Sequence, residues 1–582
     1  MRPFRHLAGG VACLTLFAAV ARADAPPDPL RLVPEQANFF VEVKDPRRLI
    51  ETGLSNELVK AAYALPPVRD FYDSTNARRF YQLVGYFEKE LAAKWPELLD
   101  KLASGGVVFA VKLGDEPAPA LVVVQGTDAD LMSKFAKAGL DVIAQELARQ
   151  ESKEKVEKGS YKDIETVHVG KDLHGARVGA ALLLSNKEEV LKLALDRHLD
   201  GGKHSLATLA AVKDSTKLLP PQALARLWLN LETVKKYPQA KEVFTSPRND
   251  VNLTVLFGGQ IDVATRSPYL CAGVYQEKDG FLTTVRLPAG RDGASADFGL
   301  HVPPADGPGL LPLLEPKDVV YSSSFFLDLS KIWNDRTKLF NDKQAKAIED
   351  AGKNPGVRLI GLSPDKILTQ AGARHRVVVV DQPKSAYKGA PSAQPIPAFA
   401  FITEMRDPDE FSKSMDAGLR AAALLAGGQF KLKLTEEKHG DYNIVAWRFP
   451  VDVKLESDTG NIRFNFSPCF VRVRTQFVFC STLELCHELV DLLDRETKKE
   501  LPRGVRAASQ SRAYGKGGAA LLRGGQDVLV TQAVLDQAIT PEAAKEQVKA
   551  LIELVQKLGV LDIEVVYEAQ QFRYDIRWKM GK

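Results

Sequence analysis

Cysteine is the residue type in this chain best able to do redox or metal chemistry. Beyond the first 23 residues the chain has an even number of cysteines, namely Cys271, Cys469, Cys480 and Cys486. If Val473 and Gln476 flank a two-residue turn, Cys469 lies directly opposite Cys480 on the paired strand. That pair falls on a hydrogen-bonded position, where a bridge is somewhat strained. Two alternatives follow: a Cys469–Cys480 disulfide, or buried apolar thiols.

Other motifs that could do chemistry are weaker. Cys480, Cys486 and His487 lack the paired spacing of a zinc site. No G-x-S-x-G elbow, H-E-x-x-H pair, Walker loop or G-x-G-x-x-G turn occurs in the sequence. The carboxylate pairs in 128–130 and 407–409 lie where helix starts need acceptors, which favours capping over acid–base catalysis. We therefore expect no catalytic residue, metal or cofactor.

A basic stretch lies between positions 498 and 523. It contains seven cationic residues against one acidic residue: Lys498, Lys499, Arg503, Arg506, Arg512, Lys516 and Arg523. A single aromatic residue, Tyr514, provides poorly for base stacking, so nucleic acid is not expected as a partner. The stretch is either a solvated loop or an anion-binding strip for an acidic envelope polymer or protein.

The N-terminus has the pattern of a signal peptide. Arg2 and Arg5 precede an apolar stretch over 7–21, and small residues follow, which predicts cleavage after Ala23 and export. Fifteen apolar residues fall short of the roughly 20 that cross a bilayer. Without residues 1–23 the 78 basic residues fall to 75, against 74 acidic ones. We expect a nearly neutral periplasmic or extracellular protein with no transmembrane segment in the mature chain.

The sequence repeats itself once. Pro119-Ala120 leads through an apolar run to Asp128, and Pro397-Ala398 leads through another to Asp407. Residues 182–188 match 478–484, and 274–281 match 566–572, in the same order along the chain. This predicts a signal peptide at 1–23, a first module at 24–290, a linker at 291–313 and a second homologous module at 314–582.

Each module is predicted to be α+β. Short β-branched runs indicate strands, and the serines of Ser185-x-x-Glu188 and Ser481-x-x-Glu484 indicate capping boxes. Apolar residues of 572–578 alternate with charged ones, which predicts one packed and one wet sheet face. We therefore expect two tandem homologous modules, each with a mainly antiparallel sheet and capped helices packed on one face.

The opening of the first repeat, Pro34 to Pro46, runs from an apolar strand through Val43-Lys-Asp-Pro into a helix. This opening, with the repeated strand and capped-helix elements, resembles an uncharacterised family of exported bacterial proteins that carry a domain of unknown function. The resemblance implies an exported protein with repeated α+β modules. It provides no catalytic residues.

Three functions are consistent with this pattern. We expect an exported, non-catalytic envelope protein that binds another macromolecule through module loops. The first alternative is a periplasmic carrier of an apolar ligand or lipid, and the second is a hydrolase with no recognisable motif. A deep apolar cavity favours the carrier, whereas filled cores with a flat or grooved surface favour the binder.

Overall fold

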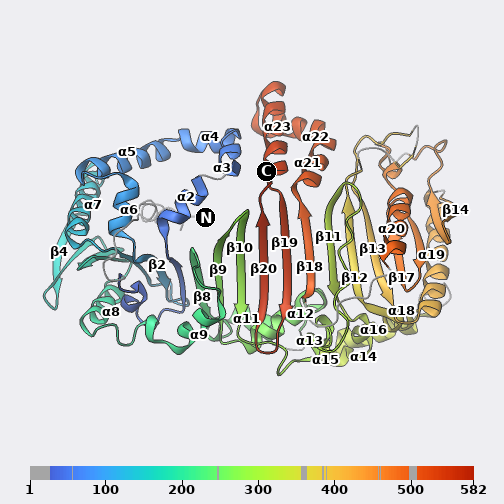
Figure 1. Ribbon diagram of the computed structural model, residues 1–582, viewed down its shortest axis with the longest axis horizontal. Coiled ribbons are helices and arrows are strands. Elements are labelled where there is room, and N and C mark those ends of the chain that lie inside the picture. The colour runs from blue at the N-terminus through green and yellow to red at the C-terminus, as the bar shows by residue number, and fades with distance from the viewer. Residues whose placement is uncertain are drawn as a thin grey trace. The chain divides into compact units, whose positions relative to one another are not determined.

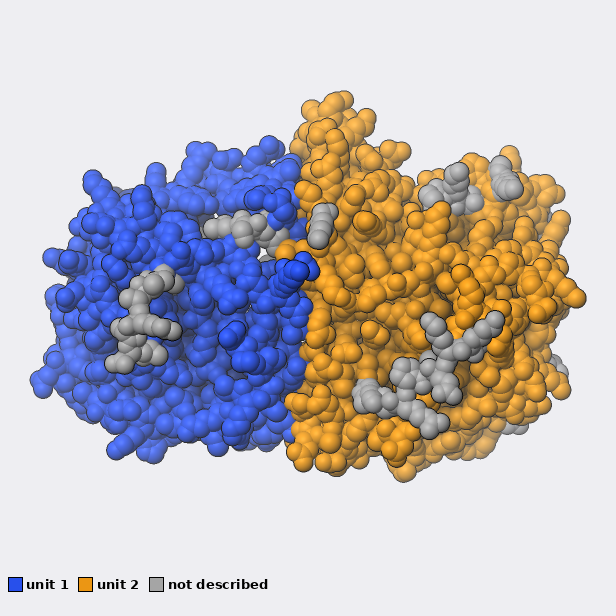
Figure 2. All heavy atoms as spheres, viewed as in Figure 1, with its two compact units in different colours: residues 1–237, 267–288 blue, residues 238–266, 289–582 orange. Residues whose placement is uncertain are grey.

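The computed structural model describes residues 26–54, 57–245, 248–355, 363–382, 386–387, 390–430, 432–455, 458, 460–496 and 507–581. The described chain divides into two compact units (Figure 2). Unit 1 comprises residues 1–237 and 267–288, and unit 2 comprises 238–266 and 289–582. The signal-peptide prediction lies outside the described residues.

The unit boundaries differ from the predicted ones in two respects. Residues 238–266 belong to unit 2, although the sequence pattern places them in the first module. The predicted linker 291–313 is part of unit 2, because it contains a short helix and the buried side chains of Phe298, Leu300 and Leu311. Both segments are joined to unit 2 by long-range packing, which a local sequence pattern does not report.

Unit 1 contains an antiparallel sheet (Figure 1). Its strands are β1 Phe39–Val43, β2 Gly106–Val111, β3 Ala120–Gln125, β4 Val156–Tyr161, β5 Ile164–Val169, β6 Leu173–Val178, β7 Ala181–Ser185, β8 Ala225–Asn230, β9 Tyr269–Glu277 and β10 Gly280–Leu287. Within the described residues of unit 1 the strands lie in the order β4-β5-β6-β7-β3-β2-β1-β8-β9-β10.

The helices of unit 1 connect these strands. They are η1 Pro29–Leu32, α2 Pro46–Leu54, α3 Glu57–Ala62, α4 Pro66–Asp73, α5 Thr75–Glu90, α6 Trp95–Leu102, α7 Ala129–Arg149, α8 Glu188–Leu199, η2 Leu206–Thr208, α9 Ala210–Leu218 and α10 Leu231–Val234. Asp128 caps α7 as predicted, because its side chain accepts a hydrogen bond from the Leu131 amide.

The strands of unit 2 are also antiparallel to their neighbours. They are β11 Val319–Phe326, β12 Ala371–Val380, β13 Ala398–Met405, β14 Lys433–His439, β15 Tyr442–Arg448, β16 Cys469–Val473, β17 Gln476–Cys480, β18 Ala507–Tyr514, β19 Val560–Tyr567 and β20 Phe572–Lys579. The described strands lie in the order β14-β15-β16-β17-β13-β12-β11-β18-β19-β20. The order in unit 2 is therefore that of unit 1 with ten added to each strand number.

The helices of unit 2 are α11 Pro238–Phe244, α12 Val251–Arg266, α13 Ala296–His301, α14 Leu329–Asn334, α15 Arg336–Leu339, α16 Asp342–Lys353, α18 Pro364–Gln370, α19 Pro408–Phe430, η3 Ile462–Asn465, α20 Leu483–Glu496, α21 Gly515–Gly524, α22 Gln526–Gln537 and α23 Pro541–Lys557. The side chain of Thr540 caps α23, because it accepts a hydrogen bond from the Ala543 amide. In the described chain no helix is both long and apolar enough to cross a membrane.

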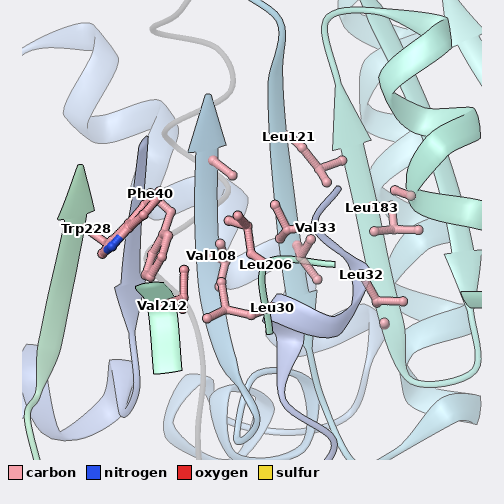
Figure 3. Close-up of a cluster of buried hydrophobic side chains, with 14 of the residues drawn as sticks. Leu30, Leu32, Val33, Phe40, Val108, Leu121, Leu183, Leu206, Val212 and Trp228 are labelled. Atoms are coloured by element: carbon pink, nitrogen blue, oxygen red, sulfur yellow. The ribbon is translucent and has the colours of Figure 1, made fainter. Parts of the chain in front are cut away.

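The α+β class with antiparallel sheets is confirmed, but helices pack on both sheet faces rather than on one. In β3, Leu121 and Val123 belong to a core with α8 and α9, whereas Val122 and Val124 pack with α5, α6 and α7. Neighbouring residues of a strand point to opposite faces, so these are two separate cores. Figure 3 shows the first core, in which the Phe40 and Trp228 rings stack at 5.9 Å.

The two repeated serines do not form the predicted capping boxes. Each lies beside the start of a neighbouring strand instead: the Ser185 hydroxyl donates to the Ala120 carbonyl, and the Ser481 hydroxyl accepts from the Phe399 amide. The Ser481 amide also donates to the Phe399 carbonyl at 2.8 Å. These hydroxyl groups therefore bond to a neighbouring strand rather than to the start of the helix. In this way Ser481 holds the first residues of β13 in place.

We predict that Ser481→Ala lowers the free energy of unfolding by about 1–3 kcal/mol, because it leaves the Phe399 amide without its hydroxyl acceptor. Chemical denaturation measures this loss. Ser160→Ala, at an exposed position of β4, is the control and should change stability by less than about 0.5 kcal/mol. Equal effects of the two substitutions would contradict the assigned role of Ser481.

Candidate functional site

One face of the unit 2 sheet carries two rows of apolar side chains, which we call the apolar face. Directly paired residues of an antiparallel sheet point to the same side, so the register defines each row. The first row crosses seven strands through Phe479, Phe401, Val377, Ser323, Ser511, Ile563 and Ile576. The second row runs beside it through Phe399, Val379, Tyr321, Ala513, Leu561 and Trp578.

The apolar face is only partly covered. Phe399 is 44% exposed and Phe401 is 38% exposed, although both lie on a central strand of the sheet. Leu561, Ile563 and Trp578 are half-buried. Large apolar side chains on central strands are normally buried, so a contiguous exposed group of them marks a binding surface. In Figure 1 the strands β11, β12, β18, β19 and β20 lie side by side.

At one end the apolar face continues beneath helices. Phe477 and Met405 pack with Phe411 of α19, and Phe479 packs against the same group. Ile367 of α18 joins this cluster. The apolar face therefore begins at a filled core on the α19 side and becomes exposed along the strands that lead away from it.

Three hydroxyl groups form the polar centre of the apolar face. The Tyr321 hydroxyl donates to Ser511 Oγ at 3.1 Å, and the Ser323 and Ser511 hydroxyls hydrogen-bond at 2.8 Å. Because these hydroxyl groups hydrogen-bond to one another, the polar atoms on this face already have hydrogen-bond partners. Nothing in either row is ionised at neutral pH, since the remaining members are aliphatic or aromatic.

A buried histidine, His375, lies in the next row on the same face of the sheet, between Phe325 and Thr403 on the neighbouring strands. The His375 ring lies between Phe325 and Phe401, with ring centroids 5.4 and 5.6 Å away. Its Nδ1 lies 2.9 Å from the Thr403 hydroxyl and its Nε2 lies 2.9 Å from the Leu327 carbonyl. The neutral imidazole satisfies both contacts, with Nε2–H donating and Nδ1 accepting. Burial lowers the pKa of His375, which keeps the ring neutral.

The opposite face of strands β18 to β20 is charged. Arg512 Nε lies 2.5 Å from Asp562, and Arg573 lies 2.8 Å from Asp575, which is 1% exposed. The segment before β11 covers this side, where Glu315 contacts Arg512 at 2.5 Å. Along β20 Phe572 is buried and the Lys579 side chain is 55% exposed, as predicted for a packed and a wet face, whereas Asp575 on the charged face is buried.

A polar pocket of about 580 Å³ lies in unit 1. Its lining residues are Asp115, Glu116, Pro117, Pro119, His168, Gly170, Lys171, His174, Lys187, Glu188 and Glu189. His168 and His174 are direct cross-strand partners with ring centroids 6.1 Å apart. Hydrogen bonding from Lys192 lowers the pKa of Glu188. This lining contains both charge signs but no hydroxyl or thiol, so it provides no serine- or cysteine-type nucleophile.

The basic stretch does not form one loop. Arg512 lies in β18 and is paired with Asp562 and Glu315, while Lys516 and Arg523 lie in α21. Arg523 donates to Gln556 at 2.5 Å. Lys498, Lys499, Arg503 and Arg506 lie outside the described residues. The anion-binding strip therefore stays a prediction, with Arg512 already neutralised by carboxylates.

The predicted cysteine register is confirmed. Cys469 and Cys480 are direct partners across the turn at Arg474–Thr475, and both are fully buried free thiols in the structure. Cys486 of α20 joins them, and the three Sγ atoms all lie within 4.8 Å of one another. These are the residues of the described chain that could hold a metal ion. Sequence spacing missed Cys486, because helix α20 folds back onto the hairpin.

The apolar face itself was not predicted. Its signal in the sequence is the alternation of Phe399-Ala-Phe401, but the neighbouring run Val377–Val380 is apolar at every position and hides which side is covered. The carboxylates of 128–130 and 407–409 act as predicted, since the Asp407 side chain accepts from the Glu410 amide.

No protein-family model and no curated protein matches the chain. A comparison with solved structures finds similarity to the chain titled "Structure of crystal form I of TP0453", with 10% sequence identity and a TM-score of 0.24. The match covers 49% of this chain and 90% of that one. At this TM-score the similarity supports no conclusion about function.

We predict that acid destabilises unit 2 partly through His375. The unfolded histidine takes up a proton near pH 6.5, whereas the buried one resists it, so the free energy of unfolding falls below about pH 6.5. The slope is at most about 1.4 kcal/mol per pH unit for this group. Denaturation of His375→Gln between pH 8 and 5 should show a shallower slope than the parent chain. His204→Gln, at a 73% exposed side chain, is the control, and an unchanged slope in His375→Gln would refute the prediction.

We predict that Arg512→Gln lowers the free energy of unfolding by about 1–3 kcal/mol. Burial opposes ionisation of Asp562, but hydrogen bonds from Arg512 and Lys579 hold the pKa of this carboxyl below its usual value. Removing Arg512 weakens that compensation. Lys516→Gln on α21 is the control, and its thermal melting should match that of the parent chain. If Arg512→Gln leaves the free energy of unfolding unchanged, Arg512 is a solvated side chain that does not stabilise unit 2.

Proposed function

We propose that the protein is an exported, non-catalytic envelope protein that binds an apolar ligand, such as the hydrocarbon chain of a lipid, on the apolar face of unit 2. The observation that carries this proposal is the exposure of Phe399 and Phe401 on a central strand, within two apolar rows. Export is supported by the composition of residues 1–23. The binding role is favoured over acyl transfer by a serine or cysteine, because the polar pocket has no hydroxyl or thiol among its lining residues.

The chemistry of the apolar face favours a hydrocarbon. An acidic polymer needs cations, and the two rows supply only three hydroxyl groups. An extended polypeptide laid on this face would leave its own backbone N–H and C=O groups without partners, because the strands beneath are already paired on both sides. An acyl chain has no polar groups to satisfy and gains from each apolar contact.

The dimensions of the apolar face are also suitable. Seven strands spaced by about 4.8 Å make the first row roughly 30 Å long. An acyl chain in one bilayer leaflet extends about 15 Å, half of the hydrocarbon core. The part of the row beyond its packed Phe479 end is therefore longer than one acyl chain, and the hydroxyls of Tyr321, Ser323 and Ser511 lie near the middle of the row.

We further infer that the two units descend from one duplicated module. Their strand orders are the same, and the repeated serines bond to equivalent strands β3 and β13. Unit 1 also presents a half-buried apolar row, through Leu184, Val122, Phe109, Val41, Leu227, Ala272 and Val285. Shared topology with matched sequence segments is typical of a tandem duplication.

A macromolecular partner is the second candidate. The partner expected from the sequence is an envelope protein, and an amphipathic helix satisfies its own backbone, so it can also lie on an exposed apolar face. The 44% exposure of Phe399 on a flat sheet favours this candidate over a ligand enclosed in a deep cavity. The following experiment separates the two.

We predict that the double substitution Phe399→Ser with Phe401→Ser weakens binding of a fluorescent 16-carbon fatty acid by at least about tenfold, equivalent to about 1.4 kcal/mol. The reason is the loss of two aromatic contacts from an exposed surface. Leu424→Ser is the matched control, because Leu424 is 80% exposed on α19 and lies outside both rows. Fluorescence titration measures both dissociation constants.

Equal affinities of the two variants, or no binding by the parent chain, would reject the hydrocarbon ligand. A synthetic amphipathic Leu/Lys helix serves as the second probe. If this peptide binds and loses affinity in the double variant while the fatty acid does not bind at all, the macromolecular candidate replaces the lipid.

A further inference from the structure

Three of the four cysteines beyond residue 23 meet in one place in unit 2. Cys469 begins β16, Cys480 ends β17, and Cys486 lies in the first turns of α20. All three side chains are 0% exposed, and their Sγ atoms lie within 4.8 Å of one another. They come from three different elements, so their convergence results from the tertiary fold.

The surroundings of this cluster are apolar. The thiols belong to a core with Val378, Ala400 and Leu489. The Cys469 thiol donates to the Thr482 carbonyl at 3.4 Å, a backbone oxygen at the start of α20. Soft sulfur ligands in an enclosed apolar site exclude water and hard oxygen donors, which restricts the ions that the site can accept.

The start of α20 places a carbonyl beside the cluster, while the Leu483 amide donates to Ser467 Oγ and the Cys486 amide donates to the Thr482 carbonyl. Burial raises the pKa of Cys469 and Cys480, whereas hydrogen bonds from these two thiols lower the pKa of Cys486. A metal ion that binds here must displace the thiol protons, because cysteine binds metals as the thiolate.

We propose that Cys469, Cys480 and Cys486 form a three-sulfur site for one soft monovalent ion, with Cu(I) as the expected occupant. Metal–sulfur bonds of about 2.3 Å place the sulfurs of a trigonal site roughly 4.0 Å apart, which the observed cluster reaches by shifts below about 1 Å. Each copper–thiolate bond that forms releases one thiol proton to solvent, and no electron is transferred.

The donor number distinguishes Cu(I) from zinc. Structural zinc takes four ligands in a tetrahedron. Among the described residues the cluster that could hold an ion contains these three cysteines, with no fourth histidine, cysteine or carboxylate in the same group. A three-sulfur set therefore suits a soft ion that accepts three-coordination. The predicted Cys469–Cys480 disulfide is the competing state, since it would consume two of the three donors.

The test is an anaerobic titration of the reduced full chain with Cu(I), in competition with a chromogenic Cu(I) chelator. We expect one ion per chain to be retained, and X-ray absorption to show three sulfur neighbours. Cys469→Ala, Cys480→Ala and Cys486→Ala should each weaken retention by about 100-fold. The double variant Cys13→Ala with Cys271→Ala should retain the ion as the parent chain does. Circular dichroism identifies any variant that fails to fold, and Cys486→Ser is the substitute in that case.

Three results would overturn the proposal. The first is an absence of stoichiometric retention by the reduced parent chain. The second is retention that is unchanged in a folded Cys486 variant, and the third is a copper ion with two sulfur neighbours. A fourth contradicting result can come from counting the free thiols of the chain isolated from its export compartment. If two thiols are missing and peptide mapping assigns them to Cys469 and Cys480, these residues form the disulfide instead of a metal site.

Discussion

The unit 2 sheet depends on one constraint, the alternation of side chains between its two faces. Antiparallel pairing from β17 to β20 places Phe401, Val377 and Ile563 in one row, and the residues between them point the other way. Once the register is fixed, the apolar side chains cannot leave their face. A covering segment on one side therefore decides which set of side chains is exposed.

In unit 2 that covering segment lies over charges. Arg376 is fully buried and pairs with Glu496, and Arg512 pairs with Asp562 beneath Glu315. Burying ionised groups costs several kcal/mol unless each is paired, and this face pairs them. The apolar face is left half-exposed, which costs hydrophobic stabilisation and gives a surface for binding. The proposed binding function therefore belongs to the face of the sheet that the rest of unit 2 leaves partly uncovered.

Local chemistry determined much of the fold that could be predicted. The turn at Arg474–Thr475 fixed the pairing of Cys469 with Cys480, and the Asp128 cap fixed the start of α7. The alternating strand β20 was predicted as well. These features depend on residues a few positions apart, so the sequence pattern reports them directly.

The features that the sequence analysis predicted wrongly or missed depend on contacts between residues far apart in the sequence. Ser185 and Ser481 fit a capping box, but a neighbouring strand takes their hydroxyl groups. Residues 238–266 follow β8 in the chain and yet belong to unit 2. The charge pairing of Arg512 in β18 depends on Glu315, which is 197 residues away in the sequence. The binding surface could not be predicted, because its exposure is decided by packing rather than by its own residues.

Photolabelling tests the role of the apolar face most directly. A fatty acid that carries a diazirine group would be activated on the folded protein, and the labelled peptides would be mapped by mass spectrometry. The account predicts labels on β13, β19 and β20, where Phe401, Ile563 and Trp578 share the apolar face. Labels confined to the exposed helix residues such as Leu424, or to unit 1 alone, would contradict it.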